Sequence, residues 1–206
     1  MCKFSLLTVG VFVALTPVIE AQQNNSNVPD APTPQTATPP ATIYTPPTQG
    51  ERLRLYVKST YGLASIVEAG VRGGLDQALD RPSEWPEGGQ GYADRFGSAM
   101  GEIAVRNTTE YVVADLFRED LRRAPCGSPC THSAFLRALQ DTFTARKGQD
   151  GHRSISVARL AGPITASAVA KEAWYPSGYS NSEIPTEAGA NYLSQFVRNL
   201  IWELHH

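Results

Sequence analysis

Apolar residues recur every three or four positions through most of this 206-residue chain, and that spacing constrains its fold more than any other feature. The clearest stripe lies near the C-terminus and consists of Leu193, Phe196, Val197, Leu200, Ile201 and Leu204. Polar side chains occupy the opposite positions Ser194, Gln195, Arg198, Asn199 and Glu203. Residues three and four apart share one face of a helix. The pattern predicts a helix that begins near residues 182–186, where capping residues and Pro185 suit a first turn.

The same spacing predicts four more helices, over about residues 51–79, 91–122, 133–146 and 156–174. Glycines at 70, 73 and 74 predict a bend in the second half of the first of these helices. Short polar side chains at 107–109 predict an interruption in the second. Residues 160–170 carry no charge, which favours a place in the middle of the bundle. The predicted fold class is therefore all-α, a bundle of about five helices.

Charged residues one helical turn apart, such as Arg72 with Asp76 and Glu102 with Arg106, are interpreted as ion pairs on water-facing sides of the first two helices. Small residues gather where the helices must meet, and they predict close helix contacts in a compact bundle. The alternative is a helical assembly that lies against or inserts into a membrane. The small residues are Gly62, Ala64, Ala69, Gly70, Gly97, Ala99, Gly101, Ala161, Gly162, Ala166, Ala168, Ala170, Gly189 and Ala190.

The first 50 residues differ from the rest in composition. Residues 1–21 begin with Lys3, continue through an apolar stretch from Leu6 to Val18, and predict a signal peptide cleaved after Ala21. Residues 22–50 are rich in Pro, Thr and Ala and predict a disordered spacer. The helical domain is expected to occupy residues 51–206.

Overall charge argues against one class of partner. The chain has 18 Lys and Arg against 20 Asp and Glu, a formal net charge of −2. Proteins that bind nucleic acid through its phosphates carry a positive surplus. The composition therefore excludes a basic nucleic-acid-binding protein.

Cys126 and Cys130 are the two cysteines that follow the predicted signal peptide, and they flank a Gly-Ser-Pro turn. In an exported chain such a pair predicts a disulfide that stiffens the turn. A redox dithiol is an alternative, as is a zinc site completed by His132 and His152.

Catalytic signatures are absent from the sequence. It contains no G-x-S-x-G, no H-E-x-x-H and no phosphate-binding loop, so no catalytic residue, metal or cofactor is assigned. The acidic residues Asp94, Glu102, Asp115, Glu119 and Asp120 are interpreted as parts of a charged surface rather than as acid and base pairs.

Three phrases carry a resemblance to a known family: Pro82-Ser83-Glu84-Trp85, the Gly-Tyr-x-x-Arg-Phe-Gly run of residues 91–97, and Trp174-Tyr175-Pro176. With the proline-rich leader, whose Val28–Pro32 segment reads Val-Pro-Asp-Ala-Pro, they resemble a family of bacterial exported helical proteins. The resemblance covers most of residues 51–204 and implies export and a helical domain, but no activity, cofactor or site. A His-Glu-Asp-Pro-Arg-Tyr-like phrase of the family is reduced at residues 118–123 to the acidic centre and an arginine.

Trp85 lies between two prolines and is expected to plug the turn between two helices, while Arg95 is expected to pair with Asp80 or Glu84. Aromatic rings beside a guanidinium also suit an anionic or sugar-like ligand. The candidate ligand groove is therefore formed by Trp85, Tyr92, Arg95, Trp174 and Tyr175.

Together these features predict an exported, non-enzymatic structural or interaction protein of the bacterial cell envelope, in the periplasm or outer envelope. Its expected partner is an envelope protein, a membrane surface or a second copy of the chain. One alternative is a membrane-associated assembly of the Gly/Ala-rich helices. Another is a ligand-binding protein or an enzyme with its site near Trp85 and Arg95.

Overall fold

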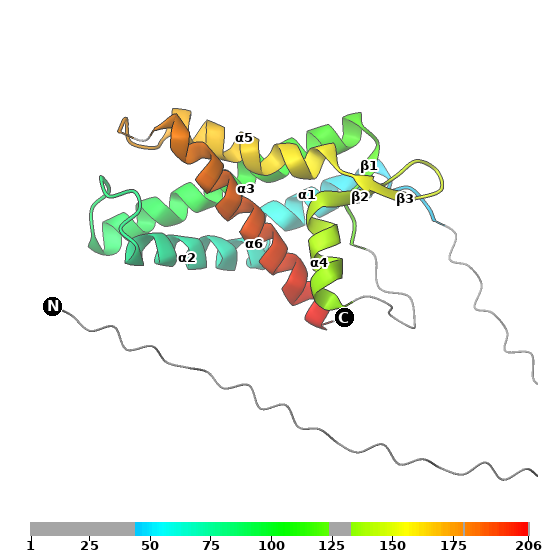
Figure 1. Ribbon diagram of the computed structural model, residues 1–206, viewed down its shortest axis with the longest axis horizontal. Coiled ribbons are helices and arrows are strands. Elements are labelled where there is room, and N and C mark those ends of the chain that lie inside the picture. The colour runs from blue at the N-terminus through cyan, green and yellow to red at the C-terminus, as the bar shows by residue number, and fades with distance from the viewer. Residues whose placement is uncertain (1–43, 124–132, 179, 206) are drawn as a thin grey trace, which may run out of the picture. The chain divides into compact units, whose positions relative to one another are not determined.

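The computed structural model describes residues 44–123, 133–178 and 180–205. In this part of the chain six α-helices and a one-turn 3-10 helix accompany a small antiparallel sheet (Figure 1). The all-α bundle predicted from the apolar spacing is confirmed. The helices are α1 (Gln49–Tyr61), α2 (Leu63–Ala78), α3 (Gly88–Leu116), α4 (Ala134–Phe143), α5 (Val157–Ala173), η1 (Asn181–Glu183) and α6 (Ile184–His205).

The predicted bend in the first helix is displaced to Gly62, which separates α1 from α2. Gly62 is extended, with φ −75° and ψ 165°, and a Cβ there would lie 2.3 Å from the carbonyl oxygen of Lys58. The close approach excludes any larger residue at this position. The glycines at 70, 73 and 74 lie inside the continuous helix α2, so the prediction of a bend among them was wrong.

Helix α3 runs unbroken through residues 107–109, contrary to the predicted interruption. The side-chain amide of Asn107 donates to the carbonyl of Ser59 at 2.7 Å, and the hydroxyl of Thr108 bonds that of Tyr56 at 3.0 Å. These polar groups bond to α1 instead of competing for the backbone of their own helix. The same contacts fasten α1 to α3.

A three-stranded sheet replaces the ends of two predicted helices. Strand β1 (Glu119–Asp120) pairs antiparallel with β2 (Thr144–Lys147), which pairs antiparallel with β3 (His152–Ile155). Strands of two to four residues are too short to show an alternating apolar pattern. The β1 residue Glu119 also caps α5, because its carboxylate accepts from the Ser156 hydroxyl at 2.6 Å and from the backbone N–H groups of Val157 and Ala158 at 2.9 and 3.2 Å.

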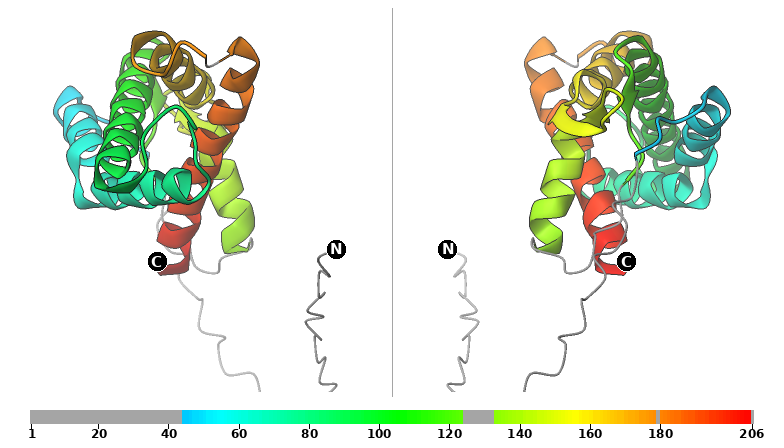
Figure 2. Two further views of the ribbon diagram at one scale, coloured as in Figure 1. Left: turned by 90° about the vertical axis from the view of Figure 1, so that its left-hand side faces the viewer. Right: turned by 90° about the vertical axis from the view of Figure 1, so that its right-hand side faces the viewer.

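Helix α3 packs against α2 on one side and α5 on another, and α6 crosses the bundle obliquely with α4 beside it (Figure 1). Seen end on, α2, α3, α5 and α6 surround a common interior (Figure 2). Some of the small residues predicted to allow close contacts do so, Gly162 among them, whereas a Cβ on Gly97 or Gly189 would meet nothing within 4 Å; Gly73, which was not among those predicted, also allows a close contact. A Cβ on Gly73 would lie 3.0 Å from the backbone nitrogen of Phe96, and one on Gly162 would lie 2.7 Å from Cγ of Glu110.

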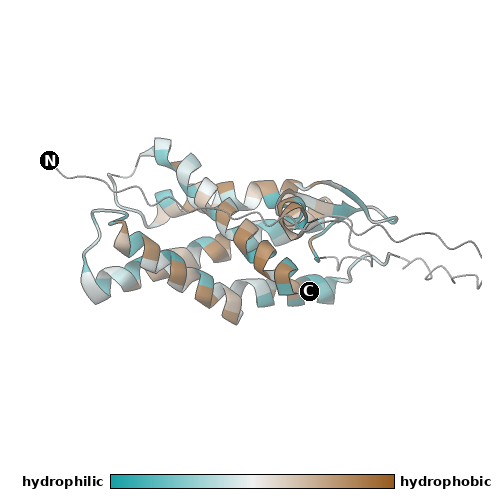
Figure 3. Cartoon of the chain, turned by 60° about the horizontal axis from the view of Figure 1, so that its bottom comes forward, coloured by the Kyte–Doolittle hydropathy of each residue, from teal (hydrophilic) through white to brown (hydrophobic). Residues whose placement is uncertain are grey.

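This bundle buries polar side chains and exposes many large apolar ones. An apolar stripe on a helix ordinarily implies the reverse, with the apolar side chains buried. Among residues 44–123, 133–178 and 180–205, ten apolar residues are buried, nine alanines and Ile103, whereas 20 polar or charged residues are buried. In the described part of the chain, 26 large apolar side chains are exposed. Apolar turns accordingly appear on the outside of several helices (Figure 3). A protein surrounded by water normally buries its large apolar side chains.

Helix α6 shows the reversal directly. Asn191, Gln195 and Asn199 are at most 1% exposed, whereas Leu193 and Leu204 of the apolar stripe are 61% and 67% exposed. The interpretation of the charged pairs on the first two helices as water-facing is also wrong. Arg72, Glu102 and Arg106 are buried, and so are Glu119 and Asp120 from the expected charged surface, because they face the shared interior.

No helix in residues 44–123, 133–178 and 180–205 combines the length and the apolar character needed to cross a membrane. The proposed Cys126–Cys130 disulfide lies outside the described residues, as do the predicted signal peptide and most of the predicted spacer. Just before α1, the hydroxyl of Tyr44 donates to Asp120 at 3.1 Å and the carbonyl of Thr45 accepts from Arg122 at 2.6 Å, so this last part of the expected spacer contacts the bundle.

Candidate functional site

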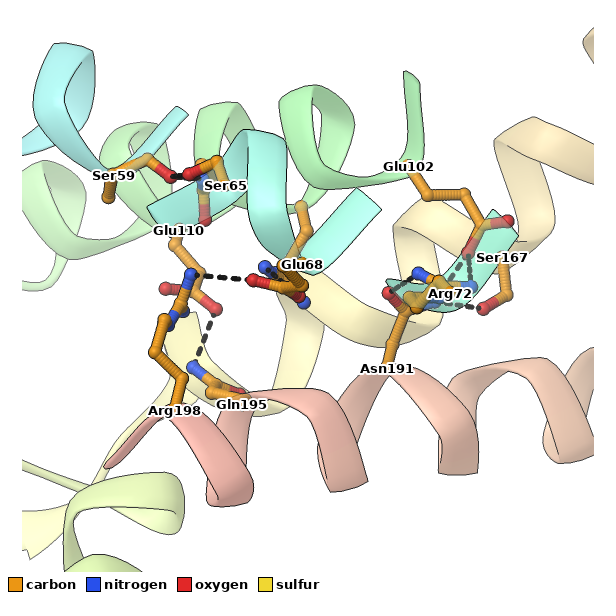
Figure 4. Close-up of polar contacts among 12 residues, drawn as sticks. Ser59, Ser65, Glu68, Arg72, Glu102, Glu110, Ser167, Asn191, Gln195 and Arg198 are labelled. Carbon is orange, nitrogen blue, oxygen red and sulfur yellow. Dashed lines mark hydrogen bonds and ion pairs between the residues drawn. The ribbon is translucent and has the colours of Figure 1, made fainter. Parts of the chain in front are cut away.

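The interior of the bundle contains two clusters of bonded polar side chains (Figure 4). The first, called here the Glu102 cluster, consists of Arg72 from α2, Glu102 from α3, Ser167 from α5, Asn191 from α6 and Tyr175 just after α5. One oxygen of Glu102 accepts from Arg72 at 3.0 Å and from the Asn191 amide at 2.7 Å, and the other accepts from the Tyr175 hydroxyl at 2.6 Å. Asn191 also bonds Arg72 at 3.0 Å and Ser167 at 3.2 Å. The cluster joins four helices.

In the Glu102 cluster, the carboxylate of Glu102 stabilises the protonated forms of Arg72 and Tyr175. Burial and the nearby Glu102 carboxylate raise the pKa of Tyr175, so its hydroxyl stays protonated and donates. Burial alone would lower the pKa of Arg72, but the attraction of Glu102 outweighs it and raises that pKa. Glu102 is therefore engaged as the acceptor of a buried ion pair, and this favours a structural role over that of a free general base.

The second group, called here the Glu68 cluster, lies one to two helical turns along the bundle and contains Glu68, Glu110, Gln195 and Arg198 (Figure 4) together with Arg106 of α3. Glu68 pairs with Arg106 at 3.0 Å and with Arg198 at 3.3 Å. Gln195 donates to Glu110 at 3.0 Å. Burial raises the pKa of Glu68, but the two arginines outweigh burial and hold the pKa below its usual value. The ion pairs of Glu68 with Arg106 and Arg198 thus connect α2, α3 and α6 at a second place in the bundle.

Asp76 lies one turn beyond Arg72 on α2 and is half-buried. Burial raises its pKa to about 6; Glu187 and Glu102 add to the rise, and Arg72 opposes it. This carboxyl therefore titrates near neutral pH, unlike an exposed aspartate.

Arg95, from the predicted ligand groove, is 1% exposed and fully engaged by the turn that joins α2 to α3. Its guanidinium donates to the carbonyls of Arg81, Pro82 and Pro86 at 2.7, 3.0 and 3.0 Å, and to Gln77 at 2.7 Å. The expected pair with Asp80 is present at 3.3 Å. These contacts assign Arg95 the role of holding the turn together.

The aromatic residues of the predicted groove are divided between two places. Trp85 meets the Tyr175 ring edge to face, with 5.7 Å between ring centres, and Tyr175 belongs to the Glu102 cluster. The Trp174 indole N–H donates to Ser98 at 2.9 Å, and its ring covers Gly101. Tyr92 is 40% exposed on α3 and stacks near Phe96. The structure thus brings Trp85 and Tyr175 together.

Two signals for the buried clusters were present in the sequence but were not recognised. Glu102, Arg106 and Glu110 recur every four residues on α3, and the sequence of α6 repeats the pattern with an amide-rich row. Residues four apart lie on one helix face. The α6 row is Asn191, Gln195, Asn199 and Glu203. These two polar rows bond to each other, Asn191 to Glu102 and Gln195 to Glu110, so the helices meet through their polar faces.

Metal binding has limited support in the described part of the chain, where no three His, Cys, Asp or Glu side chains gather closely enough to hold an ion. His152, a ligand of the alternative zinc site, is exposed, and its Nδ1 lies 3.0 Å from a carboxylate oxygen of Asp150. The other three predicted ligands, Cys126, Cys130 and His132, lie outside the described residues.

No family model matches the chain, and no curated protein or solved structure matches it either. The polar interior with exposed apolar side chains around it is the most unusual feature of the described residues.

Proposed function

We propose that this protein is a non-enzymatic, exported structural or interaction protein of the bacterial cell envelope that associates with lipid through the outward apolar faces of its helices. The predicted signal peptide and spacer support export. The resemblance to exported helical proteins supports it as well. The association with lipid has separate support, from the exposed faces of the folded domain.

The reversed polarity carries this proposal. Val67, Val71 and Leu75 on α2 are each more than half exposed, and their exposure to water would be unfavourable. At roughly 25 cal/mol per Å² of apolar surface, covering a set of such faces with lipid would stabilise the protein by many kcal/mol. Ionisable residues in proteins surrounded by lipid face the bundle interior and pair there. The Glu102 and Glu68 clusters follow that rule.

The distribution of exposed charge supports lipid in particular. Helix α2 carries no exposed charged side chain from Leu63 to Ala78, since Glu68 and Asp76 are half-buried and Arg72 is buried. Other helices do expose charges, among them Arg54 and Lys58 on α1 and Asp94 on α3, and further exposed charges lie in the connections beyond the helix ends. The charges in the connections include Asp80, Arg81, Glu84 and Glu87 after α2, Arg118 after α3, and Asp150 and Arg153 in the β2–β3 hairpin.

A single protein partner explains these surfaces less well than lipid. Exposed large apolar residues lie on all six α-helices, among them Val57, Val71, Val112, Leu136 and Ile164. A protein interface is normally one apolar centre inside a polar rim. A bilayer is a continuous apolar medium that can contact several helices at once.

Vesicle flotation tests the proposal. The full chain is expressed in an exporting bacterium, its mature N-terminus is determined by mass spectrometry, and the purified protein is mixed with uncharged phosphatidylcholine vesicles. We expect the protein to float with the vesicles in high salt, because the attraction is apolar. A protein that stays monomeric in buffer and does not float with the vesicles would contradict the proposal. One that forms a defined oligomer and ignores vesicles would replace lipid with self-association.

Matched variants show whether the helix faces are responsible. Val67→Glu with Val71→Glu places two charges on the exposed face of α2 and is expected to lower the vesicle-bound fraction at least about tenfold, since a charge buried in lipid costs several kcal/mol. Gln90→Glu adds charge at the exposed start of α3 and should leave binding unchanged. Equal binding by both variants would show that α2 does not contact lipid.

A further inference from the structure

A second feature lies at the end of the bundle near β1, where a cavity of about 380 Å³ opens between α1, α3, α5 and α6. That volume falls in the range of small-molecule sites. Two acidic side chains, Glu110 and Asp120, line it. The cationic side chains that line it are three times as many: Arg52, Lys58, Arg122, Arg123, Arg159 and Arg198. The cavity therefore has a strong positive surplus.

Some of these cations are already compensated. Arg122 pairs with Asp120 at 2.9 Å, and Arg198 pairs with Glu68 at 3.3 Å. Arg52 donates to the carbonyl of Glu119 at 2.8 Å. These contacts account for three of the guanidinium groups.

Arg123 and Arg159 are not compensated in this way, since no carboxylate among the described residues lies within 4.0 Å of either. Arg123 donates to the Asn199 amide oxygen at 3.0 Å and lies over the ring of Trp202, 5.7 Å from the ring centre. Arg159 is only 6% exposed, and one of its terminal nitrogens donates to the Leu121 carbonyl at 3.0 Å. A buried charge without a counterion is unfavourable unless a ligand supplies one.

Two buried N–H donors without an acceptor also favour an anion in this cavity. Nε of Arg159 and Nε of Arg198 are buried and meet no acceptor in the described part of the chain. Burial lowers the pKa of Arg123, and the charge of Arg159 lowers it further. Burial also lowers the pKa of Arg159 itself. An anion in the cavity would relieve both effects.

We propose that this cavity binds a phosphate group, with Arg123 and Arg159 as its principal ligands. Guanidinium groups present paired donors that match phosphate oxygens, and several of them around one cavity suit a doubly charged group better than a single carboxylate. The group can come from free phosphate or from a phospholipid headgroup. The apolar and aromatic residues Leu55, Tyr56 and Trp202 also line the cavity and can contact the remainder of a headgroup. Binding of free phosphate does not depend on the proposed association with lipid.

Calorimetric titration of the full chain with inorganic phosphate, in a mild uncharged detergent and at low salt, tests the cavity without a bilayer. We expect saturable binding and a rise in the thermal unfolding midpoint with phosphate, since a ligand that binds the folded state stabilises it. Arg159→Gln and Arg123→Gln should each weaken phosphate binding at least about tenfold. Arg54→Gln removes an exposed arginine of α1 that does not line the cavity, and it should bind like the wild type.

Arg159→Gln removes a buried charge, so without phosphate we expect it to unfold at the same temperature as the wild type or higher. If it does not fold, Arg123→Lys keeps the charge but loses the paired donors, and its weaker phosphate binding provides the same test. Vesicles of phosphatidylcholine with and without phosphatidic acid identify the source of the phosphate. Preference for phosphatidic acid that Arg123→Lys weakens indicates a headgroup; binding of inorganic phosphate without that preference indicates free phosphate. No binding of either, or equal binding by the wild type and the cavity variants, would overturn the proposal.

Discussion

Glu102 shows at the scale of one residue how the bundle holds together. Its carboxylate accepts hydrogen bonds from Arg72, Asn191 and Tyr175, which come from three separate segments. Removing one member of a buried ion pair leaves the other charge uncompensated and costs about 3–5 kcal/mol. The pair therefore specifies how the segments meet, whatever its net contribution to stability.

Glu102→Gln keeps an acceptor for Tyr175 but removes the charge that balances Arg72. We expect it to lower the free energy of unfolding by about 3 kcal/mol. The double variant Arg72→Met with Glu102→Gln should recover more than half of that loss, because no unpaired charge remains. Denaturant titration followed by tryptophan fluorescence measures both. Equal losses in the single and double variants would show that Arg72 and Glu102 do not act as a pair.

Asp76 makes stability depend on pH. Its pKa of about 6 in the folded protein lies above the value of about 3.9 expected in the unfolded chain. Between these values the folded state holds a proton that the unfolded state has lost. The stability contributed by this group is full below about pH 4 and is lost as the pH rises through about 6.

Asp76→Asn removes that dependence. We expect the variant to gain about 1 kcal/mol over the wild type between pH 4 and pH 7, a figure reduced to allow for the partial exposure of Asp76. Unfolding at several pH values measures the difference. A constant difference across this range would mean that the Asp76 carboxyl is already ionised at pH 4.

At the scale of elements, the contact between α2 and α3 depends on one of two neighbouring glycines. A Cβ on Gly73 would lie 3.0 and 3.1 Å from backbone atoms of Phe96, whereas a Cβ on Gly74 would meet nothing within 4 Å. Backbone atoms cannot move aside without shifting a whole helix. The sequence shows two equivalent glycines, and the packing distinguishes them.

Gly73→Ala is expected to destabilise the protein by about 1–3 kcal/mol, as overpacking a close contact does. Gly74→Ala should instead stabilise it by about 0.5–1 kcal/mol, because alanine favours the helix more than glycine does. Thermal unfolding of the two variants side by side checks the signs. Stabilisation by both would mean that α2 and α3 can separate at little cost.

At the scale of the whole molecule, the helices meet mainly through polar and small side chains and expose many of their large apolar ones, although Ile103 is buried with Phe96 and Met100 packed near it. Helices α2 and α6 do so in the same way, although they differ in sequence and in position along the chain. This shared orientation supports the proposed contact of the outer surface with lipid. The Val67→Glu and Val71→Glu experiment tests it on the whole chain.

Much of the fold was predictable from local spacing. The helix over residues 157–173 was placed within a residue or two, since Ser156 caps its start and Trp174 ends it. The small sheet was not predictable, because β1 has two residues and pairs with a strand more than 20 positions away. The candidate cavity was not predictable either, since its arginines come from segments that only the packed bundle brings together.

The sequence alone determined that the chain forms helices and where most of them lie, and it showed that α6 has an apolar face and a polar face. These properties depend on neighbours within a turn or two along one segment. The tertiary structure decided which face of each helix points inward. Periodicity is the same whether a helix buries its leucines or its carboxylates. Only the pairing of Arg72 with Glu102, and of Glu68 with Arg106 and Arg198, shows that the polar faces meet.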